Sequence, residues 1–284
     1  MYHLLSPHTI LENFVTLTHP FLDNTTQPDR VDLKKAYRQF IAHHQPHTPT
    51  GDHAAALFSA NNDHHSIMPN FFANEAVFAD EHDTDFHKAH APYQDALTRS
   101  QALQSAFQSL KQQDADFCFL FELLVNKVIS SPEPTPGFSA TNPKFQGIIF
   151  MMQDIIGTER GLKELMVHEF THTALFLDER RHQYYTDYQL LEQKEHYIEA
   201  AISGLFLPID RSLHSTIVST EIFLLREKLL GHPTTLDGHP PTEKILKKTR
   251  TTLRRLQNHP IIPTLFTPRA HELLERCDAI LPPL

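Results

Sequence analysis

The sequence predicts a mainly α-helical protein with a small β element and a metal site on a central helix. Three observations predict this fold class. Most segments carry apolar residues at helical spacing, one short apolar segment bounded by Pro and Gly is typical of a buried strand, and residues 168–172 read HEFTH. With 284 residues, 40% of them hydrophobic, the chain is long enough for one large core or two small ones.

The N-terminal region, residues 1–130, is predicted to be helical and is rich in histidine. Apolar residues recur at helical spacing in residues 31–44 and 93–111, and residues 117–129 are apolar enough for a buried helix. Residues 45–85 are rich in Pro, His, Asn and Asp, which predicts a long loop with at most short helices. The histidines here have no ligand-like period, which favours scattered surface residues over a storage or buffering region.

A Pro-rich linker is predicted at residues 131–143, where the stretch SPEPTPGFSATNP contains four prolines and a glycine. It separates the N-terminal region from a predicted metalloenzyme core at residues 144–284. Nothing in the sequence requires the two parts to fold independently, so they can also pack as one domain.

The core is predicted to begin with a strand at residues 145–152, followed by a helix that Thr158 caps and that extends to about Leu177. Further helices are predicted at residues 189–206, 210–230, 241–257 and 268–280. We expect Asp210 to cap the second of these, and Pro241 to lie in the first turn of the third.

The composition predicts a cytoplasmic protein. A net charge of −9 argues against broad binding to nucleic acid or to an anionic membrane surface. Only two cysteines, Cys118 and Cys277, are present, too few for a disulfide framework or a thiolate zinc cluster. No apolar run is long enough to cross a bilayer, and the N-terminal residues lack the pattern of a secretory signal.

The HEFTH motif is the strongest indication of chemistry. Four residues along a helix overshoot one full turn by only ~40°, so His168 and His172 project from the same face and can bind one metal ion. Glu169 lies beside that ion, where it can accept a proton from water or a hydrogen bond from a ligand. The flanking residues are mostly uncharged, which indicates that this helix is buried.

Two histidines do not complete a stable site, and the spacing leaves three sources for the third ligand open. Asp178 lies where metzincin proteases carry a ligand, but Leu175 stands where they need a glycine. His214 lies at the edge of an apolar helical stripe, where a ligand or an ordinary hydrogen-bonded histidine would lie. The third source is an acidic helical stripe, as in thermolysin-like proteases, made of Glu192, Glu195, His196 and Glu199.

A family resemblance favours His214. HEFTHTALFLDE, followed about forty residues later by PIDRSLHS and LLRE, resembles the HExxH-type peptide-modification proteins, the 2-oxoglutarate-dependent peptide β-hydroxylases of natural-product clusters. The resemblance covers residues 145–230. It implies Fe(II) ligands at His168, His172 and His214 with Glu169 near the metal, 2-oxoglutarate as co-substrate, and a peptide as the substrate. A three-histidine set departs from the common arrangement of two histidines and one carboxylate.

Such an enzyme also needs a cation for the distal carboxylate of 2-oxoglutarate, preferably a guanidinium. Arg211, three residues before His214, can lie on the same helical face. Arg226 is twelve residues beyond His214, or ~18 Å along a straight helix, which makes direct contact harder. Arg180 and Arg181 are weaker alternatives.

The helix predicted at residues 241–257 is basic and amphipathic, which fits either a solvated surface or an acidic leader segment of a peptide substrate. The residues thus lead to three hypotheses. The first is an Fe(II)- and 2-oxoglutarate-dependent oxygenase that hydroxylates a side-chain carbon of a peptide. The second is a zinc peptidase with Glu169 as general base, and the third is a non-catalytic helical binding protein.

Overall fold

A computed structural model describes residues 4–23, 27–48, 57–60, 67, 69–71, 78–79, 95–130, 139–151 and 158–283, and the structural statements below concern these residues. It confirms a mainly helical fold with a small β element. The α-helices are α1 (Pro7–Thr18), α2 (Arg30–His44), α4 (Ala96–Gln113), α5 (Ala115–Leu124), α6 (Glu159–His182), α7 (Ile209–Leu225), α8 (Thr242–Asn258), α9 (Ile262–Leu265) and α10 (Pro268–Ile280). Short helical turns are η1 (His19–Phe21), η3 (Gln189–Glu192), η4 (Lys194–His196) and the π-helical η5 (Arg226–Leu230).

Two small sheets complete the fold. The strands are β1 (Phe58–Ser59), β2 (Phe78–Ala79), β3 (Lys127–Ser130), β4 (Ser139–Thr141), β5 (Ile148–Met151), β6 (Ile198–Glu199) and β7 (Phe206–Leu207). The larger sheet has the order β1-β3-β5-β4-β2; β1, β3 and β5 are parallel, whereas β4 is antiparallel to both of its neighbours. The predicted strand at residues 145–152 is therefore confirmed as β5.

Strands from both sides of the predicted linker pair in this sheet. Ile129 of β3 is opposite Phe150 of β5, and residues 139–141 of the linker region itself form the buried strand β4. The main hydrophobic cluster also contains residues from both halves, such as Phe14 and Leu253. In the described residues the two halves thus share one core, which was the alternative that the sequence left open. Residues 131–138 of the linker, and most of the predicted loop at residues 45–85, lie outside the described residues.

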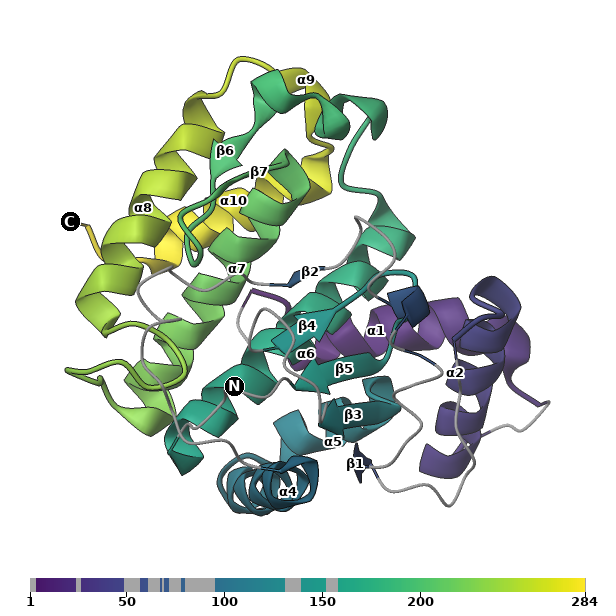
Figure 1. The fold of residues 1–284 in the computed structure, drawn as a ribbon. Coiled ribbons are helices and arrows are strands. Elements are labelled where there is room, and N and C mark those ends of the chain that lie inside the picture. The colour runs from purple at the N-terminus through teal and green to yellow at the C-terminus, as the bar shows by residue number, and fades with distance from the viewer. Residues whose placement is uncertain are drawn as a thin grey trace.

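Helix α6 crosses the centre of the molecule (Figure 1). The β3–β5–β4 part of the sheet lies on one side of it, and α7, α8 and α10 lie on the other. Every residue of α6 from Gly161 to Asp178 is buried, as its uncharged flanks predicted. Thr158 caps the helix by accepting a hydrogen bond from the Gly161 amide at 3.3 Å. The helix extends to His182, five residues beyond the predicted end.

Of the helices in the N-terminal region, α2 and α4 were predicted to within a few residues, α5 was predicted with the wrong end, and α1 was not predicted. Asp29 begins α2 with a reciprocal capping box to Asp32, and Asp95 caps α4. The helix predicted at residues 117–129 was wrong at its C-terminal end, because α5 ends at Leu124 and residues 127–130 form β3. Val128 and Ile129 are β-branched and fully buried between β1 and β5, where a strand satisfies their backbone groups.

The helix predicted at residues 189–206 was also wrong. Two short turns, η3 and η4, and the β6–β7 hairpin occupy this segment. Tertiary hydrogen bonds favour the extended backbone, because Ser212 of α7 donates to the Ile198 carbonyl and Thr252 of α8 donates to the Glu199 carbonyl. An α-helix would need both carbonyls for its own hydrogen bonds. Gly204, at φ +73°, closes the turn before β7.

Helices α7, α8 and α10 match the predicted segments at residues 210–230, 241–257 and 268–280, with small changes at their ends. The cap predicted at Asp210 was wrong, since α7 begins at Ile209 after Pro208 and has no side-chain cap. Pro241 occupies the N-cap position of α8 and not its first turn. Within the described residues, no helix is long and apolar enough to cross a membrane.

Candidate metal centre

The two histidines of the HEFTH motif lie side by side in the interior. The ring centroids of His168 and His172 are 5.1 Å apart, and their exposed fractions are 0% and 1%. Both project from the face of α6 that packs against α7 and the loop before α8. The helical spacing therefore brings the two imidazoles together, as expected because residues four positions apart lie on the same face of a helix.

His214 of α7 joins this pair. Its Nδ1 is 3.2 Å from Nδ1 of His172, and the two rings are nearly parallel at 13°. Phe176 packs against the rings of both residues. The residue that the resemblance implied as the third ligand thus contacts the HEFTH helix directly.

A fourth histidine, His239, was missed by the sequence analysis. It lies in the loop between η5 and α8, is fully buried, and places Nε2 2.8 Å from Nδ1 of His168. The rings of His239 and His168 are stacked, with centroids 5.0 Å apart. The sequence offers one local indication of a fixed position for His239: it follows a turn at Asp237 and Gly238 and precedes two prolines, which restrict the backbone next to it.

Close backbone contact positions His239. Gly238 lies at φ +70°, and a Cβ built on it would be 2.9 Å from the carbonyl oxygen of Gly161 in α6. Asp237 accepts hydrogen bonds from Thr158, at 2.6 Å from the hydroxyl and 3.2 Å from the amide. The loop is therefore held against the first turn of α6, about two turns before His168.

Replacing Gly161 with alanine is expected to lower the free energy of unfolding by about 1–3 kcal/mol, because its Cβ would lie 2.4 Å from Asp237 Oδ1 and 3.1 Å from the Gly238 amide. In a solvent-exposed helix the same change stabilises by about 1 kcal/mol, so the sign of the effect tests the contact. Urea unfolding measures it. Stabilisation by Gly161→Ala would contradict this packing.

Glu164 and Arg226 form a buried ion pair beside His239. Arg226 donates to both carboxylate oxygens of Glu164, from Nε and Nη2, at 2.8 Å each. His239 Nδ1 lies 3.3 Å from Glu164 Oε2. Burial by itself raises the pKa of Glu164, but the hydrogen bonds from His239 and Arg226 outweigh it and lower the pKa to about 2. Glu164 is thus a carboxylate that orients His239, and through it His168.

Two further carboxylates lie close to the histidine cluster, which we define as His168, His172, His214 and His239. Oε1 of the buried Glu169 is 3.9 Å from Nε2 of His168. Oε2 of Glu179 is 3.8 Å from Nε2 of His214. Carboxylates next to imidazoles are typical outer partners of metal-binding histidines, and they also stabilise histidines that bind no metal.

The structure places the other third-ligand alternatives in different networks. Asp178 binds Asn13, Tyr184 and Arg269, and these bonds occupy both of its oxygens. Glu192 and Glu195 are exposed in the turns η3 and η4, and Glu199 pairs with Arg255 on the surface. Their predicted helical face does not form.

The arginines predicted to bind 2-oxoglutarate differ in their surroundings. Arg211 lies partly exposed in the first turn of α7, one turn before His214. Arg226 is buried and donates to Glu164, to the Pro240 carbonyl and to the Thr242 hydroxyl. A role for either residue in binding 2-oxoglutarate stays a prediction.

Of the weaker alternatives, Arg181 pairs with Glu12 and binds Asn13, and Arg180 lies over the Phe40 ring.

The donors of the cluster suit Fe(II) or Zn(II), but they meet in pairs. Within the described part of the chain, no group of three or more His, Cys, Asp or Glu side chains is arranged to hold a metal ion. His172 and His214 face each other through Nδ1 atoms 3.2 Å apart. Two nitrogens bound to one ion at ~2.1 Å lie roughly 3.0–3.4 Å apart, so this spacing fits adjacent ligands as well as a hydrogen bond.

Comparison of the chain with known protein families finds no match, and comparison with curated proteins finds none either.

Proposed function

We propose that this protein is a metal-dependent oxygenase that hydroxylates a side-chain carbon of a peptide, with Fe(II) and 2-oxoglutarate. The observation that carries the proposal is the contact between His172 of α6 and His214 of α7, whose Nδ1 atoms lie 3.2 Å apart in the interior. His168, His172 and His214 form the ligand set that the family resemblance implies. Imidazole nitrogens suit iron, and three of them leave positions for substrates.

In this proposal the three histidines hold the iron and the neighbouring residues hold the histidines. Bound iron would supply oxygen activation coupled to the decarboxylation of 2-oxoglutarate to succinate. His239 bonds the Nδ1 of His168 and so fixes the direction of its other nitrogen. The Glu179 carboxylate lies 3.8 Å from Nε2 of His214, which is beyond hydrogen-bond distance. Burial of all four rings keeps bulk water from the site.

Arg211 is the residue that we propose for the distal carboxylate of 2-oxoglutarate. It is three residues before His214 on α7 and is partly exposed, so a small dianion can reach it. Arg226 is less suited, because its donors already bind Glu164, Pro240 and Thr242.

The proposed partner is a peptide or protein with an acidic leader segment, and the proposed surface is part of α8. Lys244, Lys247 and Arg254 are exposed on this helix. Fewer basic residues than expected are available on this face. Arg250 binds Asp278 and the C-terminal backbone, and Arg255 pairs with Glu199. We also propose a cytoplasmic location, which two buried free cysteines support.

A zinc peptidase is the second candidate. Glu169 favours it, since a carboxylate 3.9 Å from Nε2 of His168 can accept a proton from an attacking water. Against it, the acidic residues predicted to supply a third ligand lie in surface turns or in a surface ion pair. The four histidines could also stabilise a non-catalytic protein through hydrogen bonds alone.

Anaerobic purification followed by loading with Fe(II) tests the proposal. We expect about one iron per chain and release of succinate from 2-oxoglutarate in the presence of oxygen. His214→Ala should lose both, because one of three ligands is missing. His182→Ala is the matched control: it removes a histidine at the end of α6 that is 33% exposed and outside the cluster, and it should keep metal and turnover.

Each alternative has its own signature in the same experiment. Peptide cleavage with zinc and without 2-oxoglutarate, abolished by Glu169→Gln with metal retained, would replace the proposal by the peptidase. Protein that retains no stoichiometric metal and produces no succinate would leave only the binding protein. Unchanged iron content in folded His214→Ala would exclude this residue as a ligand.

A further inference from the structure

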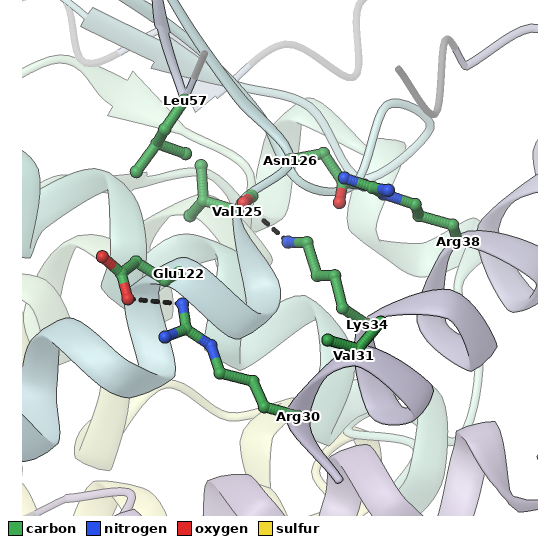
Figure 2. Close-up of a pocket in the computed structure, with 8 residues that line it drawn as sticks. All are labelled: Arg30, Val31, Lys34, Arg38, Leu57, Glu122, Val125 and Asn126. Atoms are coloured by element: carbon green, nitrogen blue, oxygen red, sulfur yellow. Dashed lines mark hydrogen bonds and ion pairs between the residues drawn. The ribbon is translucent and has the colours of Figure 1, made fainter. Parts of the chain in front are cut away.

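A pocket of about 480 Å³ lies between α2 and the C-terminal end of α5, and it shares no lining residue with the histidine cluster (Figure 2). Arg30, Lys34 and Arg38 project into it from α2. Leu57 and Val125 supply part of its apolar wall. The proposed oxygenase has no use for this pocket.

The pocket concentrates positive charge. Its three cations are spaced four residues apart, on one face of α2, where like charges repel. The single carboxylate among its described lining residues, Glu122, is already paired with Arg30 and with Lys111. The lining therefore has a formal charge of +2, from three cations and one carboxylate.

Lys34 is held rigidly at the centre of this charge. Its Nζ donates to the carbonyls of Leu123 and Val125 at 2.9 and 2.8 Å, at the C-terminal end of α5. Burial, and then the charges of Arg38 and Arg30, lower the pKa of Lys34 well below its usual value. An anion in the pocket would reduce the repulsion between the charged Lys34 and the two arginines.

Asn126 supplies an unsatisfied amide in the same place. Both polar atoms of its side chain are buried, and neither makes a hydrogen bond within the described residues. Figure 2 shows this side chain beside the Arg38 guanidinium. Buried amide groups nearly always have a partner, so a ligand with oxygen atoms would supply the hydrogen bond that the described residues do not give the Asn126 amide.

We infer that this pocket binds a small organic phosphate, with the phosphoryl group near Arg38, Lys34 and Asn126 and the organic part along Leu57. Donors from three separate residues match the several oxygens of a tetrahedral group better than the two of a carboxylate. The volume exceeds that of inorganic phosphate alone and leaves space for an apolar portion.

Calorimetric titration of the full chain, without iron or 2-oxoglutarate, tests this inference with phenyl phosphate, inorganic phosphate and succinate as probes. We expect both phosphates to bind, phenyl phosphate more tightly, and succinate to bind at least about tenfold more weakly. Arg38→Gln should weaken phosphate binding about tenfold or more, since it removes a charge-assisted hydrogen bond. Glu122→Gln should strengthen it, because a repelling carboxylate is lost.

Lys194→Gln is the matched control, because it removes one positive charge from an exposed position in η4, outside the sites proposed above. It should leave binding unchanged; an equal loss in both variants would mean diffuse attraction and overturn the inference. Absence of phosphate binding, or succinate binding as tight as phosphate, would also overturn it. Circular dichroism checks that each variant is folded, and the gain expected for Glu122→Gln cannot arise from unfolding. The result does not depend on whether the histidine cluster holds iron.

Discussion

Replacing Arg226 with leucine is expected to lower the free energy of unfolding by about 3–5 kcal/mol, because it leaves the Glu164 carboxylate buried without its counter-ion. Both side chains have an exposed fraction of 0%, so water cannot replace the lost hydrogen bonds. The same guanidinium joins α6 to the start of α8 through the Pro240 carbonyl and Thr242. Urea unfolding followed by circular dichroism measures the change.

Two further variants control this prediction. Arg255→Leu removes an ion pair with Glu199 whose side chains are 43% and 36% exposed, and it should cost less than about 1 kcal/mol. The double variant Arg226→Leu/Glu164→Leu should recover part of the loss, because no unpaired charge stays buried. A cost below about 1 kcal/mol for Arg226→Leu alone would show that the pair does not hold these elements together.

The same pair predicts how stability depends on pH. The folded-state pKa of Glu164, about 2, lies below the ordinary value of 4.5. The contribution of ionised Glu164 to the free energy of unfolding is therefore fully present above about pH 4.5 and is lost as the pH falls toward 2. That shift corresponds to roughly 3 kcal/mol at neutral pH. In Arg226→Leu the stability should fall less steeply over this range, which urea unfolding at several acidic pH values would reveal.

Asp178→Ala is expected to have a comparable effect, about 3–5 kcal/mol, for a different reason. The buried carboxylate joins three elements by accepting hydrogen bonds from Asn13 of α1 at 2.6 Å and from Arg269 of α10 through two nitrogens at 2.9 Å. It also accepts one from Tyr184 just after α6 at 2.8 Å. Its removal leaves a partly buried guanidinium and several donors without their acceptor.

Thermal and urea unfolding would measure this loss, and Glu272→Ala is the control. Glu272 is the other, 50% exposed carboxylate partner of Arg269, so its removal should cost less than about 1 kcal/mol. If Asp178→Ala kept its stability but lost bound iron, Asp178 would be a metal ligand after all, and this network would not have its structural role.

Local signals predicted most helices because they depend on neighbours in the sequence. Capping by Thr158 and the apolar spacing of α6 made that helix and the proximity of His168 to His172 predictable. The failures fall where distant residues compete for the backbone. Residues 127–130 become a strand because β1 and β5 flank them, and the predicted helix at residues 189–206 gives way to turns because α7 and α8 bind its carbonyls.

The candidate site divides in the same way. Helix geometry alone places His168 next to His172, whereas the position of His239 depends on the contact between Gly161 and Gly238, which are 77 residues apart in the chain. The roles of Arg226 and Asp178 were equally hidden, because a charged residue in a sequence does not reveal its counter-ion.

The sequence by itself determined that this protein is mainly helical, that a buried helix carries two histidines on one face, and that a short apolar strand precedes it. Only the tertiary structure decided which histidines join that pair, which carboxylates orient them, and which arginine neutralises Glu164 in the interior. The reason is physical: the helical period relates residues three or four positions apart, whereas burial and ion pairing act between residues that only the folded chain brings together.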